Sequence, residues 1–257
     1  MELEPIAWVL IATGVIVAGV SKGGFGASVG FLATPLMALA ISPVFAVGVM
    51  LPILILIDQV GMAAYWRKWR WAAVWPVCLT ACIGIGLGGF LIDKVDADAL
   101  RLGLGAIAIL FTLFQFARLR GWTPEAAAPR GLRAAIWGTA SGFTSTISHA
   151  GGPPVTMYLL GERLDKTTYQ GCSVLIFWVI NLVKLPPYFM VGAIGWDTLQ
   201  VSLWMAPVAV LGVGLGVWLH KRVSERLFFQ FMFTVLVVVG LKLCWDGATA
   251  LWGGAGV

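Results

Sequence analysis

Charged residues are scarce in this sequence: Asp, Glu, Lys and Arg make up 11% of its 257 residues, whereas hydrophobic residues make up 60%. Soluble domains are typically about 25% charged and about 45–50% apolar. Such a chain has too little polar surface for a soluble enzyme, a nucleic-acid-binding domain or a disordered scaffold. Its composition therefore predicts an integral membrane protein that has no nucleic-acid partner.

The side chains that usually build catalytic and metal sites are also few, with two His and four Cys in the whole chain. Cys78 and Cys82 lie one helical turn apart without a His or carboxylate nearby, which predicts ordinary buried thiols rather than a metal site or disulfide. The sequence has no HExxH motif, and no paired carboxylates or Ser/His/Asp set in its apolar segments. We therefore expect no enzyme activity, no cofactor and no metal.

A glycine pattern in the first half needs a separate interpretation. Residues 84–89 fit GxGxxG, but no strand precedes them and no βαβ unit surrounds them, so a dinucleotide site is excluded. The same residues have GxxxG spacing, which favours close contact between membrane helices.

Apolar segments alternate with short polar loops along the whole chain. A charged linker that contains Gly and Pro, residues 118–131, separates a first half, 1–117, from a second, 132–257. The predicted segments are roughly 6–20, 27–41, 44–66, 71–92 and 98–117, then 132–147, 152–161, 167–191, 198–219 and 225–250.

The two halves repeat an ordered series of residues. Each half opens with a glycine-rich break, and later positions correspond as Ser42 with Asp165, Gly48 with Gly171, Asp58 with Asn181, Tyr65 with Tyr188, and Gly84-x-Gly86-x-Gly88 with Gly212-x-Gly214-x-Gly216. Ser42 and Asp165 are both good N-cap residues. One match could be chance, but the series predicts an internal duplication.

Loop charge predicts the topology. Basic residues mark the cytoplasmic loops, and acidic or uncharged loops alternate with them. The cytoplasmic set is Arg67, Lys68, Arg70, Arg118, Arg120, Arg130, Arg133, Lys221, Arg222 and Arg226. The external loops contain Asp93, Asp96 and Asp98, and residues 192–197. This alternation inverts one half relative to the other and places both termini outside.

The first two segments of each half are too short for ordinary membrane spans. About 15 helical residues rise about 22 Å, less than the ~30 Å hydrocarbon core. We therefore predict an all-α membrane protein of two inverted-topology repeats, each a broken helical hairpin plus three transmembrane helices. Two thin full spans in place of each hairpin are the alternative.

The glycine-rich breaks are the predicted binding site. Backbone that turns inside a bilayer is tolerated only where protein or a water-filled cavity satisfies its polar groups. Helix N-termini and a lysine at such a break suit an anion; close packing of the hairpins is the competing interpretation. The candidate substrate-binding residues are Ser21, Lys22, Gly23, Gly24, Gly26, Ser28, Thr144, Ser145, Thr146, Ser148, His149, Gly151 and Gly152.

Asp58 and Lys184 are the ionisable residues deepest in the long spans. A charge at the bilayer centre costs about 2.5–3.5 kcal/mol on insertion scales, so such residues usually face a cavity or a partner. Because Asp58 corresponds to Asn181, and Lys184 lies one turn beyond it, we predict an Asp58–Lys184 ion pair. Asp58, Asn181 and Lys184 are the coupling or gating candidates, with a fixed ion pair between the halves as the alternative.

Taken together, these features resemble the sulfite exporter TauE/SafE family of permeases, also described as sulfonate uptake permeases. The resemblance covers roughly residues 6–245 and is carried by Gly23, Gly24, Gly26 and Pro35 in the first half, and by Gly151, Gly152, Pro153, Ile194, Gly195, Trp196, Asp197, Gly212, Gly214 and Gly216 in the second. It implies a permease for sulfite, sulfonates or related sulfur compounds in the bacterial inner (plasma) membrane.

The resulting hypothesis is a secondary transporter that moves a small sulfur-containing anion by alternating access, with Lys22 and His149 at the tips of opposed hairpins. A passive anion channel and a non-transporting membrane scaffold or assembly protein are the alternatives. The expected partners are the small anion and membrane lipid. A coupling proton or sodium ion, and a monomeric or homodimeric state, are left open.

Overall fold

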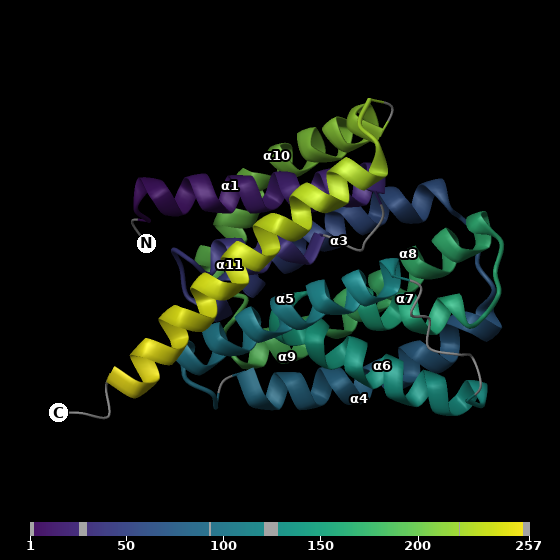
Figure 1. Ribbon diagram of the computed structural model, residues 1–257, viewed down its shortest axis with the longest axis horizontal. Helices are drawn as coiled ribbons and strands as arrows, with labels where there is room; N and C mark the ends of the chain where they lie inside the picture. The colour runs from purple at the N-terminus through teal and green to yellow at the C-terminus, as the bar shows by residue number, and fades with distance from the viewer. Residues whose placement is uncertain (1–2, 26–29, 93, 121–127, 221, 254–257) are drawn as a thin grey trace.

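The computed structural model describes residues 3–25, 30–92, 94–120, 128–220 and 222–253, and every regular element in these ranges is helical (Figure 1). The all-α prediction is therefore confirmed for the described part of the chain. The elements are α1 (Pro5–Val20), η1 (Ser21–Phe25), η2 (Gly30–Leu32), α2 (Ala33–Met37), α3 (Pro43–Ala64), α4 (Trp71–Ile92), α5 (Ala97–Leu119), α6 (Arg130–Ser148), α7 (Gly152–Leu160), α8 (Lys166–Val183), α9 (Leu185–Met190), α10 (Trp196–His220) and α11 (Glu225–Gly253).

Seven helical stretches in the described ranges are long and apolar enough to cross a membrane. Six correspond to the six long spans predicted from the sequence, and the seventh, Pro5–Gly23, is the first arm of the first hairpin. The protein is therefore a multi-pass membrane protein.

Both predicted hairpins consist of a long first arm, a break and a short second arm. In the first, α1 ends at Val20, the chain makes the π-helical turn η1, and the described part of the second arm consists of η2 and the 5-residue α2. In the second, the 19-residue α6 is followed by the 9-residue α7. Nine residues rise about 14 Å, so in the described residues neither second arm has a helix that could cross a ~30 Å core.

The second break is formed by an unusual backbone conformation. His149 follows the last residue of α6 with a left-handed φ of 55°, which reverses the chain. Its N–H still donates to the carbonyl of Ser145 over 2.9 Å, so the helix end is partly satisfied. Pro153 and Pro154 in the first turn of α7 suit a helix start, where their missing N–H groups are not needed.

The two predicted N-caps are confirmed. Ser42 Oγ accepts a hydrogen bond from Phe45 N over 3.2 Å at the start of α3. Asp165 Oδ1 accepts from Thr167 N and Thr168 N over 3.0 and 3.1 Å at the start of α8. Hydrogen bonds from Thr168, and then from Thr167, hold the pKa of Asp165 below its usual range. This stabilisation is present above the usual aspartate pKa and is lost as pH falls through the lowered value.

At the two glycine patterns, a long helix of each half packs closely against the first arm of the hairpin in the other half. A Cβ on Gly84 would overlap the carbonyl oxygen of Thr139, and one on Gly88 would lie 2.8 Å from Thr146, so α4 and α6 run parallel in close contact. Likewise, Gly212 faces Ile16 and Gly216 faces Val20, so α10 and α1 are parallel neighbours (Figure 1). These contacts agree with the packing interpretation of the GxGxxG pattern.

Two further helix pairs join equivalent elements of the two halves. Asp58 bonds with Asn181, and Gly61 faces Val174, so α3 and α8 run antiparallel. Gly105 faces Gly240 in the corresponding pair α5 and α11. An inverted duplication predicts this pattern, in which helices of one half pack against helices of the other. The inverted relation of the two halves and their boundaries remain a proposal.

Candidate functional site

Three side chains from separate elements meet at the centre of the molecule. Lys22 Nζ on η1 forms an ion pair with Asp58 Oδ1 on α3. The other carboxylate oxygen, Oδ2, accepts a hydrogen bond from Asn181 Nδ2 on α8 over 2.6 Å. The Asp58 side chain is 4% exposed and that of Lys22 is 14% exposed. The first glycine-rich break thus places its lysine against Asp58, the one acidic residue of α3.

The partner predicted for Asp58 was wrong. Lys184 lies at the joint between α8 and α9, where Pro186 and Pro187 interrupt the run of helical N–H donors. Its ammonium group donates to Ser145 O, Ser145 Oγ and His149 Nδ1 over 3.2, 3.0 and 2.8 Å. All three protons are therefore used at the second break, while Asp58 pairs with the lysine of the first break.

His149 has both ring nitrogens engaged. Nε2 lies 3.0 Å from the carbonyl oxygen of Val47, which can only accept, so Nε2 carries a proton. An ammonium group can only donate, so Nδ1 accepts from Lys184. This assignment makes the ring neutral, and it ties α3 to the second break through a residue that is 9% exposed.

A cavity of about 340 Å³ lies on one side of the Lys22–Asp58 pair. This volume is within the ~300–1,000 Å³ range of small-molecule sites. Its wall is formed by η1, α3, α8 and α10, with Lys22, Gly23, Ile57, Asp58, Val60, Gly61, Ala64, Tyr65, Gln170, Ser173, Val174, Phe177, Val213 and Val217. Because Tyr65 ends α3 and Gln170 begins α8, the cavity extends from the ion pair toward the basic loop that contains Arg67, Lys68 and Arg70.

The predicted site residues of the first break are only partly described. Lys22 and Gly23 line the cavity. Ser21 is buried and Gly24 belongs to the π-helical turn η1. Gly26 and Ser28 lie outside the described residues. A Cβ on Gly23 would overlap the carbonyl oxygen of Val213, so this glycine also allows η1 to approach α10.

The second break does not contribute to this cavity. Its hydroxyl groups donate to carbonyl oxygens of their own hairpin: Thr144 Oγ1 to Ala140 O and Ala150 O, Thr146 Oγ1 to Gly142 O, and Ser148 Oγ to Thr144 O. Gly151 packs against Ser141 and Ser145, and Gly152 begins α7. The structure therefore separates the two predicted hairpin tips: Lys22 and Gly23 of the first line the cavity beside Asp58, whereas Thr144 and Ala150 of the second lie at a separate, largely apolar hollow between α5, α6 and α7.

Two cavity residues, Ser173 and Phe177, were not predicted from the sequence. They lie on one face of α8, spaced three or four residues apart in the series Gln170, Ser173, Phe177 and Asn181. Such spacing places residues on the same side of a helix. The polar stripe Gln170, Ser173 and Asn181 within an apolar span was the signal that could have identified Ser173.

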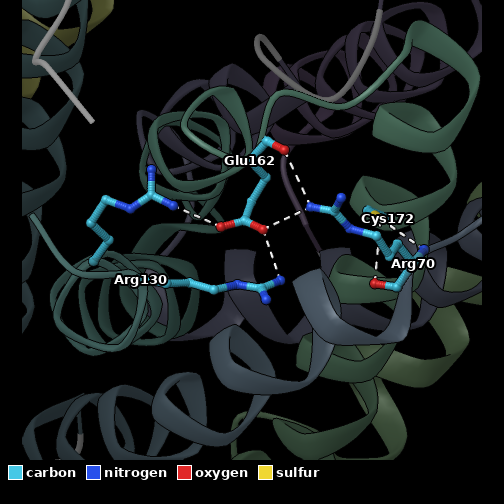
Figure 2. A network of polar contacts seen from close by, with 5 residues as sticks. Arg70, Arg130, Glu162 and Cys172 are labelled. Atoms are coloured by element: carbon cyan, nitrogen blue, oxygen red, sulfur yellow. Dashed lines mark hydrogen bonds and ion pairs between the residues drawn. The ribbon is translucent and has the colours of Figure 1, made fainter. Parts of the chain in front are cut away.

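A cluster of charges at the basic end of the molecule was also not predicted (Figure 2). Glu162, in the turn after α7, has a side chain that is 4% exposed. Its carboxylate pairs with Arg70, Arg130 and Arg133 over 2.9, 2.7 and 2.7 Å. Arg70 also donates to the Glu162 carbonyl oxygen over 3.2 Å, and its backbone N–H donates to Cys172 Sγ over 3.3 Å. The cluster fastens the second hairpin to the segment before α4, and that segment also contacts α8 through Cys172.

Comparison with known proteins identifies the family. The family model described as sulfite exporter TauE/SafE matches residues 10–243. The chain belongs to the sulfite exporter TauE/SafE family. No curated protein and no solved structure matches it. The TauE/SafE match spans both glycine-rich breaks, the central Lys22–Asp58–Asn181 contacts and the Glu162 cluster, so all of these features lie within the family region.

Proposed function

We propose that the protein is a secondary transporter that moves a small sulfur-containing anion, sulfite or an organosulfonate, across the bacterial inner membrane by alternating access. The observation that carries this proposal is Lys22, which lies in the wall of a cavity deep between membrane helices. Family membership supports sulfur anions as the substrate class. The first break, Ser21 to Gly24, supplies the primary binding residues, and the second break supplies its hydroxyl and backbone groups when the protein opens to the other side.

The charge of the central cluster favours an anion. Lys22 and Lys184 are the two basic side chains of this cluster, and Asp58 is the carboxylate that lies beside Lys22. With both lysines protonated, the three groups leave one positive charge in excess. Buried charge without a counter-charge is costly, and an anion in the cavity offsets this cost.

An asymmetry between equivalent residues supports alternating access. Tyr188 is fully buried, and its hydroxyl donates to the carbonyl oxygen of Thr146 over 2.6 Å, next to the second break. Tyr65, its counterpart in the repeat, is partly exposed and lines the cavity. If the two repeats had the same conformation, the surroundings of Tyr65 and Tyr188 would be either both open or both closed. One open and one closed half is the arrangement expected of a transporter in one of its two end states.

The direction of the open side follows from loop charge. We assign the basic loops around Arg67, Arg70 and Arg130 to the cytoplasm and both termini to the outside. With this topology, the cavity is open to the cytoplasm. The proposed repeats span 1–117 and 132–257 on either side of the 118–131 linker, and the protein is a permease rather than an enzyme.

The first experiment measures thermal stability of the detergent-purified protein with sulfite, methanesulfonate, thiosulfate, sulfate and chloride. A ligand that binds only the folded state stabilises it by about 2.7 kcal/mol at a hundredfold excess over Kd. We expect a sulfur anion to raise the thermal unfolding midpoint of the wild type and of the control Lys242→Ala. In the wild type, Lys242 pairs with Asp246 far from the cavity. Lys22→Ala should abolish the shift.

Two results would contradict this proposal. If no anion stabilises the wild type, a non-transporting scaffold is the better interpretation. If Lys22→Ala keeps the full shift, the site is elsewhere. Because Lys22→Ala leaves Asp58 without its cation, the charge-neutral double variant Lys22→Ala/Asp58→Asn is tested in parallel. Saturable exchange of labelled for unlabelled anion in proteoliposomes then separates a transporter from a passive channel.

A further inference from the structure

The carboxylate of Asp58 occupies the contact that an anion in the cavity would use. Its Oδ1 pairs with Lys22, the cavity lysine, and its Oδ2 accepts from Asn181. Both Lys22 and Asp58 line the cavity wall. An incoming oxyanion would therefore bind the same ammonium group as the Asp58 carboxylate.

Binding of the anion creates an electrostatic conflict at this site. An anion on Lys22 would lie beside an ionised Asp58, and two negative charges in a poorly solvated space raise each other's free energy. Lys184, the other basic side chain nearby, does not stabilise this added negative charge, because its Nζ already donates all three of its protons to Ser145 and His149. Protonation of Asp58 removes the conflict.

The groups around Asp58 are compatible with a protonated, uncharged carboxyl group. Asn181 Nδ2 can continue to donate to Oδ2 when that atom is the carbonyl oxygen of a carboxylic acid. The proton reaches Oδ1 from the cavity, where Ser173, Gln170 and Tyr65 supply polar groups. The charged or titratable groups around Asp58 are Lys22 from η1, Lys184 at the end of α8 and His149 from the second break, while α10 contributes Val213 and Val217 to the wall.

We propose that Asp58 is a proton-coupling carboxylate, so that each anion bound at Lys22 is accompanied by one proton on Asp58 Oδ1. This inference rests on the proposed function. Binding forms an O–H bond at Asp58 and breaks its ion pair with Lys22. Release of the anion on the opposite side returns the proton to water and restores the pair. Asn181 is a positioning residue that holds the carboxyl group in place through both steps.

The same geometry favours a proton over a sodium ion. The two carboxylate oxygens face donors, the ammonium group of Lys22 and the amide of Asn181. A metal cation at Asp58 would be repelled by Lys22 and would have to displace the Asn181 amide hydrogens. A proton needs neither change.

Coupling gives anion binding a defined pH dependence. Because a proton is taken up on binding, affinity rises as pH falls. Over the pH range in which Asp58 is ionised in the free protein, uptake of one proton per anion lowers the Kd of the anion tenfold for each unit by which pH falls. Methanesulfonate and thiosulfate suit this measurement, since their own charges do not change between about pH 5 and 8.

The test uses the full-length protein in proteoliposomes that contain a pH-sensitive dye, with membrane potential clamped by potassium and valinomycin. An inward gradient of methanesulfonate or thiosulfate should acidify the lumen of wild-type vesicles, equally with sodium or choline in the buffer. Asp58→Asn should acidify nothing and should bind these anions with a Kd that does not vary with pH. The control Asp96→Asn, at an exposed carboxylate that caps Asp98 N–H, should behave as wild type.

Each contrary result has a distinct meaning. Anion uptake by the wild type without acidification, or acidification by Asp58→Asn, overturns proton coupling and leaves the proposed function intact. A wild type that neither binds nor exchanges methanesulfonate, thiosulfate or sulfite overturns the proposed function as well. If Asp58→Asn does not fold, calorimetry of wild-type binding in two buffers with different heats of protonation decides: one proton taken up supports the proposal, and none overturns it.

Discussion

His149 and Lys184, two residues with basic side chains, are hydrogen-bonded to each other at the second break, with 2.8 Å between His149 Nδ1 and Lys184 Nζ. The arrangement holds because the ring is neutral and donates its Nε2 proton to Val47 O. Lys184 is fully buried. His149 is therefore a structural acceptor for a buried ammonium group in this state.

This pair predicts a strong energetic coupling. His149→Ala leaves both Lys184 and Val47 O short of a partner, and we expect a loss of about 1–3 kcal/mol because unsatisfied buried polar groups are costly. Adding Lys184→Met removes the group that needs the acceptor. A double-mutant cycle measured from unfolding midpoints should give a coupling energy of about 0.5–3 kcal/mol.

Lys242→Met is the matched control for this cycle, because Lys242 is exposed and pairs with Asp246 one turn away. Strictly additive effects of His149→Ala and Lys184→Met would contradict the hydrogen bond.

The open side of the cavity makes a prediction about chemical access. Ser173 lines the cavity, so Ser173→Cys should react with a membrane-impermeant thiol reagent applied from the side of the basic loops. Methanesulfonate should slow the reaction if it binds at Lys22. Reaction only from the opposite side would contradict the topology.

Ser202→Cys is the control for access. Ser202 is 4% exposed and donates to Val49 O over 2.8 Å, away from the cavity wall. We expect it to be unreactive from either side. The wild-type protein, with its four native cysteines, provides the background rate.

Much of the fold could be predicted from the sequence because the bilayer imposes strong constraints on composition. Apolar runs located the long helices, and Gly and Pro located the breaks. The contact of α3 with α8 agrees with the repeat match between Asp58 and Asn181, which are hydrogen-bonded. Ser42 and Asp165 were recognisable as N-caps because capping depends on local sequence.

The partners of buried charges were not predictable in the same way. Repeat symmetry placed Lys184 near Asp58, but the symmetry does not say how far the first break reaches inward. Lys22 reaches Asp58 because η1 continues the first arm as a π-helical turn and packs against α10 at Gly23. The Glu162 cluster joins three segments that are distant in sequence, and loop charge indicated only that its arginines lie at the cytoplasmic end.

The close packing of α4 on α6 predicts opposite effects at two neighbouring glycines. A Cβ on Gly84 would overlap the Thr139 carbonyl oxygen and lie 2.6 Å from Phe143 N, so Gly84→Ala should cost about 1–3 kcal/mol by overpacking. Gly86 has nothing within 4 Å of such a Cβ. Gly86→Ala should be neutral or stabilising by up to about 1 kcal/mol, since alanine is the better helix former.

Thermal midpoints in detergent would measure this difference, with roughly 2–4 °C expected per kcal/mol for a chain of this size. Equal tolerance of alanine at both positions would mean that α4 and α6 are not in direct backbone contact. Gly212→Ala and Gly214→Ala repeat the comparison in the second half, where Gly212 faces Ile16 and Gly214 faces open space.

The Glu162 cluster predicts a hierarchy of destabilisation. Glu162 is the buried member, at 4% exposed, whereas the side chains of Arg70 and Arg130 are 47% and 41% exposed. Removing the carboxylate leaves three guanidinium groups in mutual repulsion, so Glu162→Gln should approach the ~3–5 kcal/mol typical of breaking a buried ion pair. Arg70→Met or Arg130→Met should cost less, because each leaves Glu162 with two of its three arginines.

Arg133 should be the most sensitive of the arginines, because its side chain is 12% exposed and its guanidinium group packs against Gly161. Arg101→Met is the control, since Arg101 forms a partly exposed pair with Asp98 three residues away and such pairs contribute about 0–1 kcal/mol. Unfolding midpoints of the five variants test the order. If Glu162→Gln is no more destabilising than Arg101→Met, the carboxylate does not anchor the second hairpin to the segment before α4.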